Sequence, residues 1–331
     1  MEEGLRFGMM GAGRKAELRA FQLYQMRVDI PWLSGRTLRQ PWGSYVLYLD
    51  AEIKEFVEWM QPSAAELASF EGALERIRKS INGLWPEAKV HVFGSFKAGL
   101  ALFNSDIDVV VEYAPEREER ALLLQLKNHL LRSGLCQKLE ARPHAKVPIL
   151  VVEEKKSGVC MDLQFNRKSG PRAALVQAAL LDTFGPLRAL VLTLKAFLKT
   201  RGLNEPFSGG VGSYCLFLMV VYFLQHHHKR EAELGASPRH SVFLLLREFL
   251  KFYGAAFHWA KFGISIAEGG FLFDRSRECA ACAKQGPPYG TLCVESPEDP
   301  ENDAARSSFR FSEVAQAFRG ALGLLAARSW E

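Results

Sequence analysis

The 331-residue sequence lacks several features that mark whole classes of protein. Its longest apolar run, Tyr214–Leu224, has 11 residues, whereas a membrane-spanning helix needs about 20. Six cysteines in a chain of this length do not form the disulfide framework of a small secreted domain. The opening residues MEEGLRF carry acids where a leader peptide carries basic residues. These absences predict an intracellular protein with no membrane segment.

The composition is that of a folded protein. Hydrophobic residues make up 48% of the chain and charged residues 24%, with no internal repeat or low-complexity segment, which excludes a disordered chain. Lys plus Arg number 42 against 37 Asp plus Glu, a net charge of +5 that suits a polyanionic partner without requiring one. At about 150 residues per domain, the length predicts about two domains.

Apolar periodicity predicts helices before and after a sheet. A helix over 44–60 is closed by Pro62, and the next begins with the capping-box pair Ser63 and Glu66. The apolar stripe of this second helix has 3,4 spacing and consists of Leu67, Phe70, Leu74, Ile77 and Ile81. Runs rich in β-branched residues predict strands at 90–94, 107–113, 147–154 and 159–165, the last two forming a hairpin. Further helices are expected at 116–133, 186–201, 213–227 and 240–254.

This pattern predicts an α+β protein with a mixed sheet. We expect a flexible N-terminal arm over 1–30 and a sheet domain over 63–165. A mainly helical domain is expected from 31–62 together with 166–331.

Two carboxylates stand at the start of a predicted strand. Asp106 follows Gly94 of the Gly94-Ser95 turn by 12 residues. Side chains two apart on a strand share a face, so Asp106 and Asp108 project together and Ile107 faces inward. Carboxylates this close repel unless a cation lies between them. A hard divalent cation such as Mg²⁺ prefers oxygen ligands. Asp162, on another predicted strand, would be a third ligand.

A bare Asp-x-Asp is more often a pair of solvated turn residues than a metal site. Here the Gly-Ser turn, the β-branched strand and the later Asp162 together favour the site. This arrangement resembles the DNA polymerase β-like nucleotidyltransferase superfamily. The resemblance implies that the Gly94-Ser95 turn holds a triphosphate. It also implies that the three carboxylates bind two metal ions, Mg²⁺ or Mn²⁺, for two-metal phosphoryl transfer.

Two later stretches offer further nucleotide ligands. Lys195 and Lys199 lie four apart on one helix face, where they would grip a triphosphate; the alternative is two solvated surface lysines. FSGGVGSYCL, residues 207–216, supplies the Ser213 hydroxyl and the Tyr214 ring after glycines that permit close backbone approach; the alternative is a plain glycine-rich loop.

Residues 292–322 combine a Pro- and acid-rich loop with an amphipathic helix, and their composition alone predicts nothing more specific. As an ordered string they are similar to the nucleotide recognition motif of the non-canonical poly(A) polymerases of TRAMP-type RNA surveillance complexes. The segments PWL, EIKEFVEW and LWPEAKVHVFGS match that family too. The resemblance covers about residues 29–325.

The resemblance implies a role for individual residues. It makes Asp106, Asp108 and Asp162 the catalytic and metal-binding residues, and it gives the helical domain the family's central, poly(A) polymerase-associated fold. The nucleotide-binding residues that it implies are Gly94, Ser95, Asn166, Lys195, Lys199, Ser213, Tyr214, Asn302, Asp303 and Arg306. One departure is that the family commonly has Asp-Pro where this chain has Ser296-Pro297.

The implied activity is a polynucleotide adenylyltransferase that adds AMP from ATP to an RNA 3′ end without a template. Related uridylyltransferases often carry a His in the recognition loop, whereas this chain has Asn302, which favours ATP. A uridylyltransferase with the same site stays open as an alternative. An inactive scaffold is disfavoured by the intact Asp106, Asp108 and Asp162. By resemblance, we also expect a zinc-knuckle RNA-binding partner, a helicase and a nuclear location.

Two clusters look like metal sites and are interpreted otherwise. His226, His227 and His228 precede Lys229 and Arg230, so a solvated, mildly cationic helix end is expected. Cys279 and Cys282 form a CxxC, but structural zinc needs four ligands at suitable spacing and no fourth is evident, so a reduced surface loop is expected.

Overall fold

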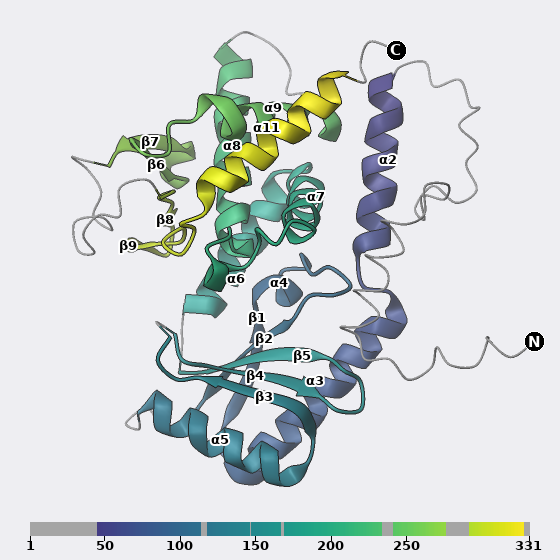
Figure 1. Cartoon of the computed structure of the whole chain (residues 1–331), viewed down its shortest axis with the longest axis vertical. Coiled ribbons are helices and arrows are strands. Elements are labelled where there is room, and N and C mark those ends of the chain that lie inside the picture. The colour runs from purple at the N-terminus through teal and green to yellow at the C-terminus, as the bar shows by residue number, and fades with distance from the viewer. Residues whose placement is uncertain are drawn as a thin grey trace, which may run out of the picture. The chain divides into compact units, whose positions relative to one another are not determined.

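The computed structural model describes residues 45–113, 118–145, 147–166, 169–233, 241–275 and 291–327 (Figure 1). The predicted arm over 1–30 and the Cys279/Cys282 motif lie outside these residues. The described chain packs as two compact units. The sheet unit is formed by Gln61–Ala174, and the helical unit combines the helix that ends at Met60 with the chain from Leu175 onward.

The sheet unit contains one mixed five-stranded sheet, as the sequence predicts. Its strand order is β1-β2-β5-β4-β3, with β2 parallel to β5 and all other neighbours antiparallel. The helices are α3 (Ala64–Leu84), the short α4 (Gly94–Lys97) and α5 (Glu119–Ser133). The strands are β1 (Lys89–Phe93), β2 (Ile107–Glu112), β3 (Cys136–Arg142), β4 (Ile149–Glu154) and β5 (Cys160–Phe165).

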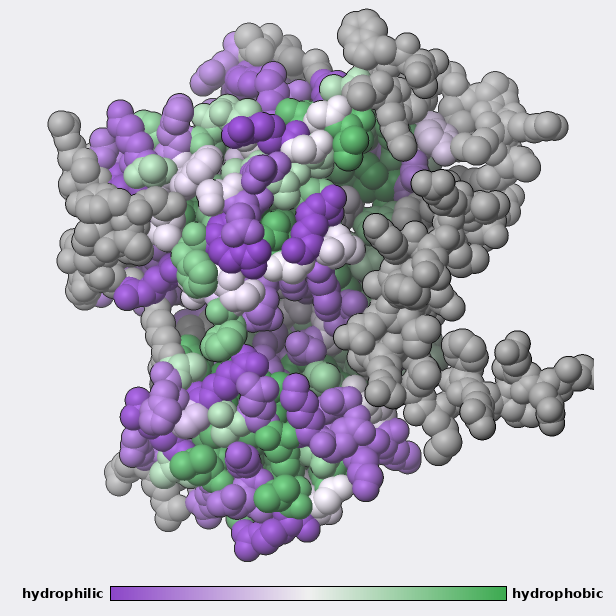
Figure 2. All heavy atoms as spheres, viewed as in Figure 1, coloured by the Kyte–Doolittle hydropathy of each residue, from purple (hydrophilic) through white to green (hydrophobic). Residues whose placement is uncertain are grey.

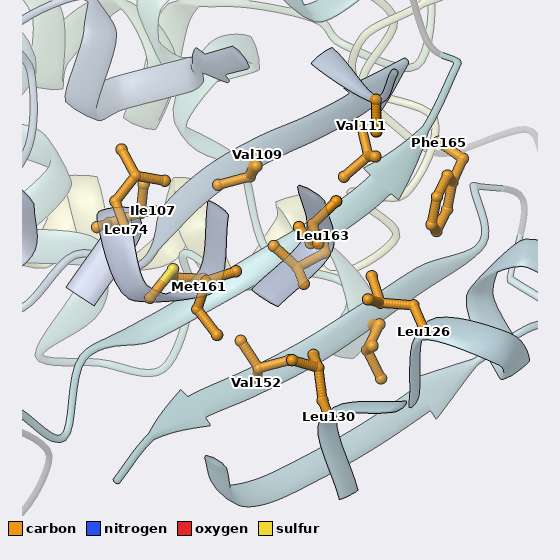
Figure 3. Packing of buried hydrophobic residues seen from close by; sticks show 14 of the residues in the cluster. Leu74, Ile107, Val109, Val111, Leu126, Leu130, Val152, Met161, Leu163 and Phe165 are labelled. Carbon is orange, nitrogen blue, oxygen red and sulfur yellow. The ribbon is translucent and has the colours of Figure 1, made fainter. Parts of the chain in front are cut away.

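The core of the sheet unit lies where α3 and α5 cover the sheet (Figure 3). The predicted capping box of α3 is present, because the Ser63 hydroxyl accepts from the Glu66 N–H and the Glu66 carboxylate accepts from the Ser63 N–H. The predicted stripe of α3 is buried except for Leu67, which is 40% exposed. Apolar residues also reach the surface over α5 (Figure 2), where Leu124 and Leu131 are exposed.

Strand β3 does not follow from apolar periodicity, because it is an edge strand that reads CQKLEAR and none of its residues is fully buried. Backbone pairing with β4 forms this strand, and such pairing does not require apolar side chains.

The neighbouring strand β4 carries Glu154, which is 1% exposed. Its carboxylate accepts two hydrogen bonds, of 3.0 and 2.8 Å, from the Arg76 guanidinium of α3. This bidentate pair ties α3 to the sheet.

The helical unit is built around α8, whose apolar run from Cys215 to Leu224 is buried. Helix α8 spans Ser213–Glu233. The other large helices of the unit are α2 (Tyr45–Met60), α7 (Leu187–Lys199), α9 (Val242–Lys251), α11 (Phe311–Ala327) and α6 (Ser169–Thr183), whose first turns belong to the sheet unit. A π turn, η4 (Phe252–Ala256), extends α9, so the helix predicted over 240–254 is present in two parts. Short 3₁₀ segments are η3 (Pro206–Ser208) and η5 (Ala267–Gly269).

Helix α2 joins the helical unit although the sheet unit separates it in sequence. It packs against α7 and α9. Asp50 of α2 accepts bonds from the Ser241 hydroxyl (3.0 Å) and the Phe243 N–H (2.7 Å) at the start of α9. An α2 carboxylate therefore satisfies one backbone N–H and the capping hydroxyl at the N-terminus of a distant helix.

Two small hairpins complete the helical unit, and neither is predicted from the sequence. One pairs β6 (Phe262–Ser265) with β7 (Phe271–Asp274), and the other pairs β8 (Glu295–Ser296) with β9 (Asp299–Asp303). Within the described ranges, no single helix is long and apolar enough to cross a membrane. Among the helices that the structure describes, one pair, Arg172–Thr183 with Leu187–Lys199, is long and apolar enough jointly, and it is bent by 120°.

Candidate active site

The three predicted catalytic carboxylates come from two neighbouring strands. Asp108 of β2 and Asp162 of β5 are direct register partners on parallel strands, so their side chains share a face of the sheet. Asp106 lies two residues before Asp108 and is exposed, while Ile107 between them is fully buried. The inward direction of Ile107 is confirmed. The fold thus presents the three acids at one end of the adjacent strands.

The Cys160 thiol, at the start of β5, senses these carboxylates. Burial, and after it the negative charges of Asp106, Glu153 and Asp162, raise the pKa of the Cys160 thiol to about 11. Asp106 and Asp162 therefore lie within electrostatic reach of one side chain. Their shared negative field would attract a cation to this end of the sheet.

Gly94 brings a backbone turn against the acids. It has φ +64, and a Cβ placed there would collide with the Asp108 carboxylate. Only glycine accepts both the left-handed backbone and this close approach. Ser95 follows in the first turn of α4 and is half-buried. The Gly-Ser turn predicted from the sequence therefore packs directly on the Asp-x-Asp strand.

The three carboxylates suit a divalent cation that takes some of its ligands from the protein and the others from a substrate. Among the residues that the structure describes, no three His, Cys, Asp or Glu side chains converge into a metal-binding group. Asp106, Asp108 and Asp162 nonetheless supply only carboxylate oxygens, which Mg²⁺ and Mn²⁺ favour. Mg²⁺ commonly binds one or two carboxylates together with substrate phosphates and waters. The donor chemistry fits such an ion, and the metal itself stays a prediction.

Asn166, one of the predicted nucleotide-binding residues, directly follows β5 in a strained backbone conformation. Its φ is 51, uncommon for a residue other than glycine. The side-chain oxygen accepts from the Tyr113 N–H (2.9 Å), and the amide nitrogen donates to the Tyr113 carbonyl (3.0 Å). The amide therefore closes the end of the β2–β5 pair, which gives it a structural role. Its nucleotide contact stays a prediction.

The lysines of α7 differ from a solvated pair. Lys195 is only 5% exposed, and Lys199 one turn later is half-buried. The interpretation as two surface lysines is therefore wrong for Lys195. An ammonium group is buried only at a high cost unless anionic or polar groups meet it. A helix face that carries two such cations is suited to polyanionic phosphates.

The glycine-rich loop before α8 is tied to the loop before α11. The Gly209 carbonyl accepts from the Arg310 N–H (2.9 Å), and the Gly210 carbonyl accepts from the Ser308 hydroxyl (3.1 Å). A Cβ at Gly210 would lie 2.5 Å from the Leu203 carbonyl oxygen, so this glycine permits close backbone packing. The loop leads into Ser213 and Tyr214, the first residues of α8.

Tyr214 is held by Glu298, an acid to which no sequence motif points. Its hydroxyl donates to the Glu298 carboxylate at 2.6 Å. Burial raises the pKa of Tyr214 well above its ordinary value, and the Glu298 bond and charge raise it further. The only signal in the sequence is a glutamate directly after Ser296-Pro297, and its partner lies 84 residues away.

The predicted recognition loop is a β-hairpin, and Asp303 organises it. One Asp303 carboxylate oxygen accepts from the Val294 N–H (2.9 Å) and the Ala305 N–H (2.8 Å). Burial and then the Asp303 charge raise the pKa of Cys293 to about 12. Asn302 is half-buried, and Arg306 is exposed just after the hairpin. Asp303 thus supports the loop, and its predicted nucleotide contact stays a prediction.

The histidine run requires a correction. His227 is 8% exposed and Glu231, one turn later, is 6% exposed, so the expected solvated helix end is wrong for His227, whereas His226, Lys229 and Arg230 are exposed as expected. Burial lowers the pKa of His227. The cause is packing, since the His227 ring lies 5.8 Å from the Phe223 ring within the core of the helical unit.

Comparison with known proteins finds two family models that match separate parts of the chain. The family described as "Poly(A) RNA polymerase, mitochondrial-like, central palm domain" matches residues 49–185. The family described as "Cid1 family poly A polymerase" matches residues 242–302. The first match contains Asp106, Asp108 and Asp162, and the second includes Asn302.

Curated relatives extend the match. Poly(A) RNA polymerase protein 2 of Saccharomyces cerevisiae is 34% identical over 92% of this chain and 52% of its own length. Poly(A) RNA polymerase protein 1 of Eremothecium gossypii is 33% identical over 92% of this chain and 48% of its own. The chain thus spans about half the length of these relatives. The inactive non-canonical poly(A) RNA polymerase protein Trf4-2 of Drosophila melanogaster is 36% identical, covering 82% of this chain and 67% of that one.

Solved structures show the same fold. The polymerase core of TRAMP, described as an RNA surveillance complex, superposes with a TM-score of 0.80 and 32% identity over 91% of this chain and 93% of that one. The Cid1 poly(U) polymerase superposes with a TM-score of 0.71 at 21% identity, a likeness of fold alone. The mixed sheet and helices are those of a polymerase β-like nucleotidyltransferase core with a helical central domain. Since a relative at 36% identity is covered over two thirds of its length and the TRAMP core over nearly all of its own, the chain belongs to the non-canonical poly(A) RNA polymerase family.

Proposed function

We propose that this chain transfers AMP from ATP to the 3′ end of RNA without a template. The observation that carries the proposal is the register pairing of Asp108 with Asp162 beside a Gly94 turn that leaves no room for a side chain. Family membership supports a nucleotidyltransferase, because several relatives are named poly(A) RNA polymerases.

In the proposed reaction, the carboxylates and the Gly-Ser turn have different roles. In the reaction the RNA 3′ oxygen bonds to the α-phosphorus, the bond to the β-phosphate oxygen breaks, and pyrophosphate leaves while the hydroxyl proton passes to solvent. When bound, two divalent cations activate the attacking hydroxyl and neutralise the leaving pyrophosphate. Asp106, Asp108 and Asp162 hold these cations, and the Gly94-Ser95 turn orients the triphosphate.

The helical unit supplies groups for the nucleotide. Lys195 and Lys199 neutralise the β- and γ-phosphates, and the Ser213 hydroxyl donates to a phosphate oxygen. Tyr214 stacks on the base, while Asn302 and Arg306 lie on the recognition loop that selects it. The Asn302 amide favours adenine over uracil in this proposal, with uridine addition as the alternative outcome.

The test is extension of a short RNA primer by the purified chain with each of the four nucleoside triphosphates and Mg²⁺ or Mn²⁺. We expect ATP to be used best, and preferential use of UTP would move the assignment to a uridylyltransferase. The Asp106→Ala/Asp108→Ala variant should lose extension entirely yet remain folded, because the two acids repel each other without metal. If that variant extends RNA as well as the natural chain does, the mechanism is wrong.

An inactive scaffold is the competing function, because one relative that resembles this chain is named as inactive. The intact carboxylates favour an enzyme, and absence of any extension under all of these conditions would favour the scaffold. The likeness to the polymerase core of TRAMP supports a role within an RNA surveillance complex. We propose, from the family resemblance alone, that its partners are a zinc-knuckle RNA-binding protein and a helicase and that it acts in the nucleus. Co-purification of the tagged chain from nuclear and cytoplasmic fractions tests both partner and location.

A further inference from the structure

The turn of the β8–β9 hairpin reaches back to the nucleotide-binding helix. Pro297 and Glu298 form the turn between Ser296 and Asp299, which pair across the hairpin. Pro297 and Asp299 are exposed, whereas Glu298 between them is half-buried, because its carboxylate accepts the Tyr214 hydroxyl at 2.6 Å. The acid of this turn thus points toward α8 rather than into solvent.

Ser296 offers a second position beside the same phenol. It is fully buried and lies close enough to lower the pKa of Tyr214. Its hydroxyl has no hydrogen-bond partner of good geometry within the described part of the chain. An acid at 296 would therefore also lie near the Tyr214 hydroxyl.

The Tyr214–Glu298 bond has the strength to orient a ring. A hydroxyl that donates to a carboxylate makes a charge-assisted bond, roughly twice as strong as one between neutral groups. A ring held in one orientation before binding spares the entropy of ordering it on the ligand. The ordered ring then presents its face for stacking.

We propose that Glu298 is a positioning residue that fixes the plane of the Tyr214 ring for stacking on the nucleotide base. The inference rests on the proposed function and adds the residue that prepares its base-stacking ring. Glu298 contacts Tyr214 and not the reacting atoms, so it acts on nucleotide affinity. Loss of Glu298 should weaken ATP binding equally in the ground state and in the transition state. Such a loss raises KM and leaves kcat unchanged.

The experiment compares primer extension and direct ATP binding for the natural chain, Glu298→Leu, Glu298→Gln and Tyr214→Phe. Glu298→Leu and Tyr214→Phe each remove the bond, and we expect a KM and a Kd for ATP raised about tenfold with kcat within about twofold. Glu298→Gln keeps an acceptor and should show a smaller rise. Glu301→Leu, at an exposed glutamate of β9, is the matched control and should leave both constants unchanged.

Two combined variants separate positioning from mere stability. Tyr214→Phe/Glu298→Leu should be no worse than the worse single variant, because both changes break one interaction. Ser296→Asp/Glu298→Leu returns an acid to the phenol and should recover most of the lost affinity. A lower melting temperature with unchanged KM would overturn the inference, as would additive losses in the first pair. Extension by the natural chain checks the proposed function independently, so the two failures are distinguishable.

Discussion

At the scale of single residues, Gly94 is the position with the least freedom in the candidate site. Its positive φ and the Asp108 carboxylate beside its Cα both exclude a side chain. Gly83 in α3 is its opposite, since a Cβ there would meet nothing within 4 Å. Packing therefore requires glycine at position 94 but not at position 83, a difference that the sequence alone does not show.

We predict that Gly94→Ala abolishes most nucleotide addition and lowers the free energy of unfolding by about 1–3 kcal/mol, because the backbone is strained and Asp108 is displaced. Gly83→Ala should keep full activity and raise stability by about 0.5–1 kcal/mol, as expected for alanine inside a helix. Primer extension and urea unfolding measure both. An active Gly94→Ala enzyme would contradict the role of the turn.

At the scale of elements, the Arg76–Glu154 ion pair joins α3 to β4 and contributes to the stability of the sheet unit. Glu154 also accepts from the Ser157 N–H at 2.8 Å. Burial opposes the charge of Glu154, but the bonds from Arg76 and Ser157 prevail and lower its pKa to about 2. A carboxylate with a depressed pKa stabilises the fold above its unfolded pKa of 4.5, and this contribution is lost as pH falls toward about 2.

We predict that Arg76→Met lowers the free energy of unfolding by about 3 kcal/mol at pH 7, because Glu154 is left buried without its cation. The difference in unfolding free energy between Arg76→Met and the natural chain should shrink as pH falls from 4.5 toward 2. Arg78→Met is the control, since Arg78 pairs with Glu75 at the surface and should cost under about 1 kcal/mol. Urea unfolding across this pH range is the measurement, and a gap independent of pH would argue against the buried pair.

At the scale of the whole molecule, the helical unit is discontinuous in sequence. Helix α2 precedes the sheet unit, and Asp50 joins it to α9, which follows. A truncation that removes α2 would therefore expose the faces of α7 and α9 that it covers. The sheet unit is an insertion within the chain of the helical unit.

The net charge of +5 supports only a general attraction to RNA phosphates. We predict weak RNA binding by this chain alone, with an affinity that falls steeply between about 50 and 200 mM salt. Fluorescence anisotropy with a labelled single-stranded RNA measures it, and a poly-anion such as heparin should compete. Tight, salt-resistant binding would show that the chain needs no partner to hold RNA.

The sequence by itself determined four of the five strands of the sheet, the capping box of α3 and the inward direction of Ile107, because each depends on neighbours at short, fixed spacing. It also pointed to the family, through an ordered set of motifs. It did not reveal edge strand β3, the burial of Lys195 and His227, or the Tyr214–Glu298 bond. Those depend on partners far away in the chain, and local periodicity carries no information about them. Only the tertiary structure decided which acid reaches Tyr214, because the hairpin turn that carries Glu298 meets α8 across 84 residues of sequence.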